Sequence, residues 1–396
     1  MNPPSLLQIV ERLERLAGRL PGRIRKAVLS ELTPLKQLFL QQRPPRFLIT
    51  GSGVMPIGRI ISALFAAPDL IEVSEIAVPS CRWHDINLPD RGTISILDAR
   101  RADVSTAIKL EDELKYQPAD IIFFIDEGQI AGGRGNNEPD NFTTLAVWNK
   151  TSRSDAGARV IGIVVAPSEG GIAPGQINQT VSESKTELRS NFAGGETVSD
   201  VFKLVPEHRG EGLELPGPQA QRLMSILARQ LPNQARMEMI RISRDRAAQH
   251  EVAQLLVKST TAICAAVGAQ PIPLADLPIL TSLQVMMISG IMYVSGRERS
   301  LRAATEFIGA LGANVGAAML LREGTRAVLK FFPGWGNVIC GLVAGSATYA
   351  IGRAATVFFI DGVSLKDARR TYRTSRKKRA RLALSASGSL DKSGPS

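Results

Sequence analysis

The sequence has few of the residues from which catalytic and metal sites are usually built. Only three of its 396 residues are histidines and only three are cysteines. His84, His208 and His250 have no partner at metal-ligand spacing, and no Ser-His-Asp, H-E-x-x-H or paired-carboxylate arrangement is visible. The sequence therefore predicts no catalytic constellation and no metal site.

The cysteines indicate a reducing compartment. Cys81, Cys264 and Cys340 are far apart, odd in number and without C-x-x-C spacing. Such spacing argues against a zinc site or a disulfide framework and favours reduced, packed thiols. The first residues also lack the basic segment and the apolar run of a secretory signal. We therefore expect a cytoplasmic protein.

The length of the chain limits the number of domains, and its charge is concentrated near the C-terminus. A chain of 396 residues is long enough for two or three domains with full-sized cores. The formal net charge of +11 is uneven, because residues Arg369 to Arg381 carry much of it. A basic segment of this density binds phosphate, on lipid or on nucleic acid.

The first 42 residues have a helical pattern. Leucine and isoleucine recur at three- and four-residue steps until Pro21-Gly22, and a second helix is predicted from Arg23 to about Gln41. We predict an N-terminal helical hairpin over residues 1–42, packed on the body of the protein. A dimerising coiled coil is the alternative, although stable coiled coils need three or more heptads.

Residues 46–215 have the pattern of an α/β domain. Helices are predicted over about 57–65, 104–116 and 142–151, and they alternate with buried strands at Phe47–Thr50, Thr93–Leu97, Ile121–Ile125 and Val160–Val165. Such crossovers predict a largely parallel, doubly wound sheet. Ligands of these sheets lie beyond the carboxyl ends of the strands, so the residues that follow each strand matter most.

The first strand is followed by a glycine-rich turn and a helix, in the order of a P-loop. In the pattern G-x-x-x-x-G-K-[ST] the lysine neutralises phosphate and the hydroxyl holds Mg²⁺. If the two glycines of the pattern are aligned with Gly53 and Gly58, Arg59 takes the place of the lysine and Ile60 that of the serine or threonine. The positive charge is then kept, but the hydroxyl is lost. Alignment on the helix puts Gly51 first and Pro56-Ile57-Gly58 in place of Gly-Lys-Ser, so that both functional side chains are missing.

We favour the alignment on the helix, because it preserves the helix that packs on the sheet. An ordinary turn between a strand and a helix is the simpler interpretation, since a glycine-rich turn alone is a weak signal.

The other strand ends keep parts of nucleotide-binding motifs. Asp98 follows the second predicted strand, where Asp-x-x-Gly would be expected, but Arg101 replaces the glycine. Glu169 follows the fourth strand, where Asn-Lys-x-Asp would bind guanine, and it retains a carboxylate. Asp126-Glu127 is interpreted as a solvated strand end. The candidate nucleotide-binding residues are thus Gly51, Gly53, Gly58, Arg59, Asp98 and Glu169.

These motifs carry a resemblance to known families. Arg46 to Val165 resembles the G domain of Era- and TrmE-like bacterial GTPases in spacing, with the phosphate, magnesium and guanine motifs eroded. The remainder resembles the YcjF-type helical domain of unknown function that is found fused to such G domains. That second match depends on Pro271–Pro278, Gln284–Met287, Phe332–Gly336 and Ala344–Gly352. The resemblance implies a GTPase-like architecture and GTP as the cofactor to test, with Mg²⁺ doubtful.

The C-terminal half is distinctly apolar. After an amphipathic helical stretch from Gln219 to Thr260, residues Leu277–Gly296 and Phe331–Gly352 are uncharged over about the 20 residues that span a bilayer. Gly341 to Gly345 and Gly312 to Gly316 are G-x-x-x-G motifs, which let helices approach closely. Basic residues between the two runs argue against a simple two-span hairpin. Buried core helices and bilayer insertion both stay open.

We therefore predict a helical domain over residues 219–370 and a basic, largely disordered tail over 371–396. The segment after Arg369 is interpreted either as a solvated helix end that becomes disordered by Ser385 or as an anchor for anionic lipid. The leading functional hypothesis is a GTPase-family protein with little or no GTPase activity that acts as a scaffold or regulator at the inner membrane. The alternatives are a functional, atypical GTP-binding protein and an RNA- or ribosome-associated factor.

Overall fold

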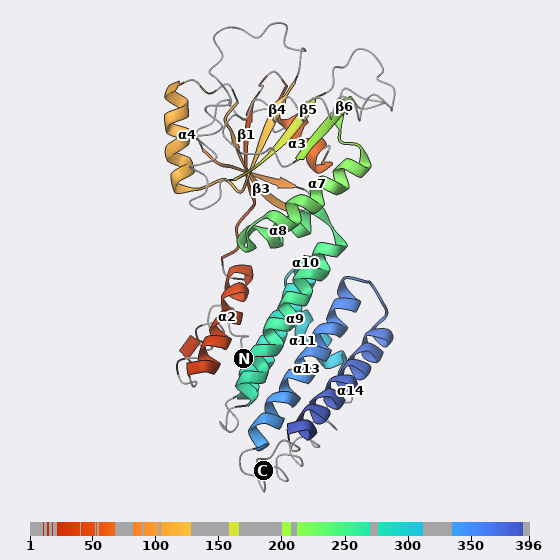
Figure 1. Ribbon diagram of the computed structural model, residues 1–396. Coiled ribbons are helices and arrows are strands. Elements are labelled where there is room, and N and C mark those ends of the chain that lie inside the picture. Colours follow the sequence, from red (N-terminus) through yellow and green to blue (C-terminus); the bar gives the residue numbers. More distant parts are fainter. Residues whose placement is uncertain are drawn as a thin grey trace. The chain divides into compact units, whose positions relative to one another are not determined.

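The computed structural model consists of two compact units, residues Arg43–Asp245 and residues Met1–Gln42 with Arg246–Ser396 (Figure 1). The first is an α/β unit and the second is helical, which confirms an α/β domain combined with a C-terminal helical region. The described residues are 11, 14, 15, 18, 22–39, 41–51, 53, 55–67, 82–88, 91–100, 102, 104–127, 158–165, 200–206, 212–269, 276–311 and 335–390.

The α/β unit is built on a seven-stranded sheet with the order β2-β3-β1-β4-β5-β6-β7. Neighbours among β3, β1, β4, β5 and β6 are parallel, whereas β2 and β7 are antiparallel strands at the two edges. The strands are β1 (Arg46–Gly51), β2 (His84–Leu88), β3 (Gly92–Asp98), β4 (Ile121–Asp126), β5 (Arg159–Val165), β6 (Asp200–Pro206) and β7 (Leu213–Glu214). The strands predicted from apolar runs, and the largely parallel sheet, are confirmed.

Strand β1 is where the order of the sheet reverses. The chain places β2 and β3 on one side of β1 and then continues with β4 on the other side. In open α/β sheets the crevice beyond the carboxyl ends of the strands at such a point is where ligands bind. We call the carboxyl ends of β1, β3 and β4, with the residues that follow them, the β1 corner.

Helices cover both faces of the sheet, as a mostly parallel sheet requires. Successive strand residues point to opposite faces, so that Phe47 and Ile49 pack with α3 (Ile57–Phe65), α7 (Gly217–Gln230) and α8 (Asn233–Ser243). Leu48 packs on the other face with Leu110 of α4 (Val104–Tyr116). The predicted bounds of α3 and α4 are confirmed, and the helix predicted over 142–151 lies outside the described residues.

The helical unit is organised around α9 (Arg246–Gly268). This helix packs against α2 (Gly22–Phe39), α10 (Asp276–Val294) and α13 (Trp335–Phe359). Helix α2 matches the predicted second helix of the N-terminal hairpin, while the first helix lies largely outside the described residues. Because α2 packs on α9, its residues belong to the helical unit and not to a separate N-terminal segment.

The glycines of α13 let it pack closely on α9. A Cβ atom on Gly341 would lie 2.7 Å from the backbone oxygen of Ala265, and one on Gly345 would lie 3.0 Å from the Cβ of Ala265. The predicted role of this G-x-x-x-G motif in helix packing is thus confirmed. The second motif, Gly312 to Gly316, lies outside the described residues.

Two predicted segments differ from the structure. The amphipathic stretch from Gln219 to Thr260 is three helices, because Pro232 separates α7 from α8 and Arg244, with φ of 53°, ends α8. Helix α14 extends over Leu365–Leu390, so residues 371–390 are helical where a largely disordered tail was predicted.

A short helix, α11 (Leu301–Leu311), packs beside α10 and α14.

The apolar runs form helices in this unit. Within the described chain, one helical segment, Gly341–Phe359, is long and apolar enough to cross a membrane, and half of its most apolar window is buried. In α10 the apolar segment Leu280–Val294 is shorter. Length and composition alone do not separate a membrane helix from the core helix of a bundle.

Candidate site at the β1 corner

The chain leaves β1 through a turn that requires glycine. Gly51 is the last residue of β1 and has φ of 98°, and a Cβ atom there would lie 2.2 Å from the carbonyl oxygen of Ile125 on β4. Only glycine combines this dihedral with such a close approach. Helix α3 begins at Ile57, directly after Pro56 at its N-cap. We call residues 52–56, which connect β1 to α3 in the sequence, the turn after β1.

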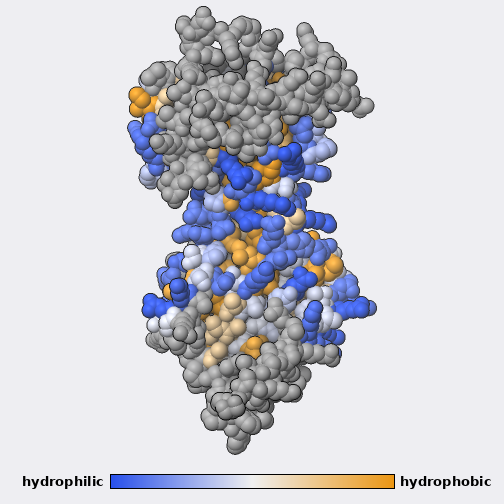
Figure 2. Space-filling model, viewed as in Figure 1, coloured by the Kyte–Doolittle hydropathy of each residue, from blue (hydrophilic) through white to orange (hydrophobic). Residues whose placement is uncertain are grey.

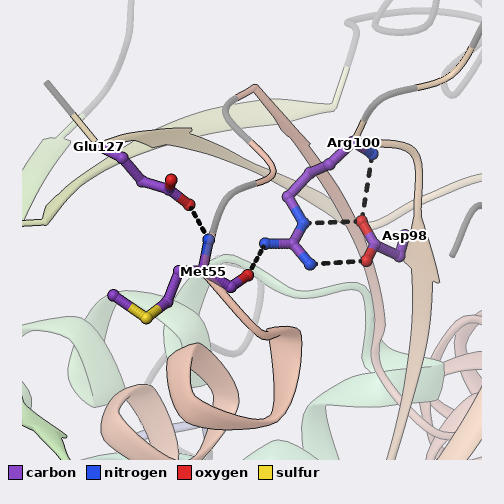
Figure 3. A network of polar contacts seen from close by, with 4 residues as sticks. All are labelled: Met55, Asp98, Arg100 and Glu127. Carbon is purple, nitrogen blue, oxygen red and sulfur yellow. Dashed lines mark hydrogen bonds and ion pairs between the residues drawn. The ribbon is translucent and has the colours of Figure 1, made fainter. Parts of the chain in front are cut away.

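Asp98 and Arg100 form a buried ion pair at this corner (Figure 3). The Nε atom of Arg100 donates to Oδ1 of Asp98 at 2.9 Å, and Nη2 donates to Oδ2 at 2.8 Å. The backbone N–H of Arg100 also donates to Oδ1, at 3.1 Å. The two side chains are only 2% and 1% exposed. Bidentate pairs of this geometry are among the strongest charge-assisted hydrogen bonds.

Met55 connects this ion pair to the turn after β1. Its carbonyl oxygen accepts a hydrogen bond from Nη1 of Arg100 at 2.8 Å, and its backbone N–H donates to Oε1 of Glu127 at 2.9 Å. Figure 3 shows Arg100 and Glu127 reaching Met55 from opposite sides. The segments that follow β1, β3 and β4 are thus joined through one residue of the turn.

Glu127 differs from the prediction for the end of β4. The sequence predicted a solvated strand end at Asp126-Glu127, yet Glu127 is 2% exposed. Its carboxylate accepts a backbone hydrogen bond from the turn, which is the kind of partner that makes a buried carboxylate tolerable.

The remaining candidate residues are placed as follows. Asp98 lies at the corner with Gly51, while Gly53 is half-buried in the turn. Gly58 is buried in the first turn of α3, and the side chain of Arg59 is exposed on the same helix. Glu169 lies outside the described residues. The structure therefore brings Gly51 and Asp98 together and adds Arg100, Met55 and Glu127, which the sequence analysis had not selected.

The donor set at the corner does not fit Mg²⁺ held as in a G domain. Both oxygens of Asp98 already accept hydrogen bonds from Arg100. The first residues of α3, Ile57-Gly58-Arg59-Ile60, include no hydroxyl, although a serine or threonine hydroxyl is the P-loop ligand of the ion. Among the described residues no group of three or more His, Cys, Asp or Glu could hold a metal ion. Arg100 supplies the positive charge at this place.

A second buried cation lies on β6. Lys203 is 1% exposed, and its ammonium group has no hydrogen-bond acceptor within the described part of the chain. Burial lowers the pKa of Lys203, because an ammonium ion is disfavoured away from water. Lys203 was not selected from the sequence, since one lysine within a short strand gives no signal of burial.

No family model matches this chain, and neither does any of the curated proteins.

Proposed function

We propose that this protein is a GTPase-like protein whose nucleotide corner is closed by its own arginine, and that it acts as a membrane-associated scaffold or regulator without efficient GTP hydrolysis. The observation behind the first part is the buried Asp98–Arg100 pair with its hydrogen bond to Met55. In a nucleotide-binding P-loop domain, phosphate and Mg²⁺ take the place beside such a turn and such a carboxylate.

The topology supports a P-loop-like, doubly wound domain. The glycine turn joins β1 to α3 at the reversal point of the sheet, and Asp98 is the last residue of the neighbouring parallel strand β3. A P-loop has the same order of strand, glycine-rich turn and helix N-terminus. The start of α3 at Ile57 supports the alignment in which Gly51 is the first glycine, and in that alignment the phosphate-binding lysine is missing.

The ion pair would oppose nucleotide binding. Mg²⁺ could use the Asp98 carboxylate only after Arg100 had left it, and breaking a buried pair costs about 3–5 kcal/mol. Such a cost weakens binding by roughly two to three and a half orders of magnitude. A corner of this kind holds its loops in one arrangement without a nucleotide, which suits a scaffold better than a switch.

Nucleotide binding and hydrolysis by the purified protein test this proposal. We expect binding of a fluorescent GTP analogue to be weaker than micromolar, with or without Mg²⁺, and phosphate release to stay at the level of the buffer. Arg59→Ala should change neither the binding of the analogue nor the release of phosphate, because in the favoured alignment Arg59 does not occupy the position of the phosphate-binding lysine. Micromolar, Mg²⁺-dependent binding with turnover would show that the proposal is wrong.

A further inference from the structure

Helix α14 has one cationic face. At 3.6 residues per turn, basic residues 366, 369, 370, 373, 376 and 377 fall within an arc of about 120°, and the exposed Lys378 lies beside that arc. Apart from the half-buried Arg369, these residues are exposed. Hydrophilic residues colour the part of the helical unit where α14 begins (Figure 2). The basic segment is therefore an ordered stripe and not only a run of charges.

The opposite side of α14 packs against the unit. Ala368 is buried, and Thr371, Tyr372 and Ser375 are half-buried on the side that faces away from the stripe. The helix packs on α13 and α11, and Nε of Arg369 donates to the carbonyl oxygen of Ala310 at 2.9 Å. Because α14 is held by its other side, the cationic face is presented outward.

The charge of this face is not neutralised within the described residues. No described acidic group pairs with Lys366, Arg370, Arg373, Arg376 or Lys377, and the sole acidic residue of the helix, Asp367, accepts a hydrogen bond from Ser364. On the neighbouring helix α11, by contrast, Arg302 pairs with Glu306. A concentration of like charges without counter-charge is unfavourable by itself and attracts a polyanionic surface.

The apolar helices already have partners inside the unit. Gly341, Gly345 and Gly352 of α13 lie close against other helices, and Leu283, Met287 and Ile291 of α10 are fully buried. Insertion of α13 into a bilayer would require its separation from α9. The packing of α13 on α9 therefore opposes its insertion into a bilayer as a separate helix.

The surroundings of the cationic face favour lipid over nucleic acid. Single-stranded nucleic acid is held largely by stacking on aromatic side chains, and the aromatic residue of α14, Tyr372, lies on the packed side. Leu342 and Val343 of α13 are 39% and 46% exposed. Since α13 and α14 are consecutive antiparallel helices (Figure 1), this apolar pair lies near the C-terminal half of α14, beyond the cationic residues 366–377. A basic face without counter-charge and without exposed aromatic residues, among the residues that the structure describes, suits the surface of an anionic bilayer.

We propose that the cationic face of α14 binds an anionic lipid bilayer while α10 and α13 stay packed in the helical unit. This inference rests on the proposed membrane association and identifies its contact surface and its peripheral mode. It is independent of nucleotide binding, because α14 and the β1 corner belong to different units.

Vesicle binding by the full-length protein tests the inference. We expect binding to vesicles of phosphatidylcholine with phosphatidylglycerol, and little binding to phosphatidylcholine alone. The triple variant Arg370→Gln, Arg373→Gln and Lys377→Gln should lower the partition coefficient about 100-fold, since each basic residue beside an anionic surface contributes roughly a fivefold gain. The matched control is Arg25→Gln, Lys26→Gln and Lys258→Gln, which removes three exposed cations of the same unit. This control should bind within about twofold of the wild type.

Salt separates the peripheral mode from insertion. High salt should release the bound wild-type protein, because electrostatic attraction to lipid is screened within a Debye length. Equal losses in both triple variants would overturn the assignment to α14, and salt-resistant binding would overturn the peripheral mode. Tighter binding to single-stranded RNA than to anionic vesicles, lost in the α14 variant, would overturn the choice of lipid. Circular dichroism of both variants checks that they are folded. GTP binding is measured on the same samples, so that a failure of the nucleotide proposal can be told apart from a failure of lipid binding.

Discussion

The side chain of Arg100 lies between a carboxylate and a backbone carbonyl, with three of its nitrogen atoms donating hydrogen bonds. A buried guanidinium is tolerated only when its charge is paired and its donors are satisfied. Asp98 supplies the charge and Met55 the remaining acceptor. Each group therefore makes the burial of the other tolerable, and neither is expected to be replaceable alone.

Arg100→Met should destabilise the α/β unit by about 3–5 kcal/mol, because it leaves the Asp98 carboxylate buried without a counter-charge. The double variant Asp98→Leu and Arg100→Met removes both charges and should be more stable than Arg100→Met alone. Urea unfolding of the wild type, the two single variants and the double variant gives the coupling energy of the pair. Additive effects would show that the two side chains do not stabilise one another.

Cys264 is a buried thiol of α9 whose titration affects stability. Burial raises the pKa of its thiol to about 12, and a hydrogen bond with Thr348 opposes that rise. Since the folded pKa lies above the ordinary value of 9.0, the neutral thiol favours the folded state at lower pH. This contribution is complete below the unfolded pKa and is lost as the pH rises toward the folded pKa.

We therefore expect the helical unit to lose stability between about pH 9 and pH 12, and Cys264→Ala to lose less over the same range. The measurement is the free energy of unfolding of both proteins at several alkaline pH values. Comparison with the variant isolates the thiol from the lysines and tyrosines that titrate in the same window. Parallel pH profiles would contradict the burial of a neutral thiol.

At the scale of elements, the packing of α13 on α9 depends on the absence of side chains at its glycines. A methyl group at Gly341 would press on the backbone oxygen of Ala265, which cannot rotate away as the end of a side chain can. Gly309 of α11 has no atom within 4 Å of where its Cβ atom would be. The two glycines therefore give the same substitution opposite consequences.

Gly341→Ala should destabilise the helical unit by about 1–3 kcal/mol, the usual cost of overpacking. Gly309→Ala should stabilise it by about 0.5–1 kcal/mol, because alanine loses less backbone entropy in a helix. Thermal unfolding of the two variants beside the wild type measures both effects. Stabilisation by both substitutions would mean that α13 does not approach α9 closely.

The elements that the sequence predicted are those whose signal is local. Strands β1, β4 and β5 contain continuous apolar runs, β3 has buried apolar residues at Ile94, Ile96 and Leu97, and α3 follows a glycine turn. Strand β2 was missed because His84–Leu88 is short and partly polar, and its conformation depends on pairing with β3. Composition suggested that the helix after Arg369 would become disordered by Ser385, whereas α14 continues to Leu390.

The candidate site was predicted only in part, for the same physical reason. Gly51 and Asp98 could be found because they follow buried strands at the predicted ligand edge. Arg100 and Glu127 are recognisable only once three segments meet, since Arg100 contacts Met55 across 45 positions and Glu127 contacts Met55 across 72. Burial of a charged residue is a property of such long-range contacts and has no local pattern.

At the scale of the whole molecule, the α/β unit is an insertion within the helical unit. Residues Arg43–Asp245 interrupt a unit that begins before them with α2 and resumes after them with α9. Each unit has its own buried core: Phe47 and Phe123 lie at the centre of the sheet, and Leu256 and Met287 in the helical unit. Domains with separate cores commonly fold on their own.

The last prediction is that the two units unfold as separate cooperative transitions. Arg100→Met should lower the midpoint of one transition and Gly341→Ala that of the other, because each substitution acts on contacts inside a single unit. Differential scanning calorimetry of the wild type and both variants measures this, and expression of residues 43–245 alone identifies which transition belongs to the α/β unit. That fragment should unfold at the temperature of the transition that Arg100→Met shifts, since the β1 corner and its hydrophobic core lie within it. If either substitution moved both midpoints equally, the units would be thermodynamically coupled, and the Asp98–Arg100 pair would then influence the stability of the helices that pack beneath α14.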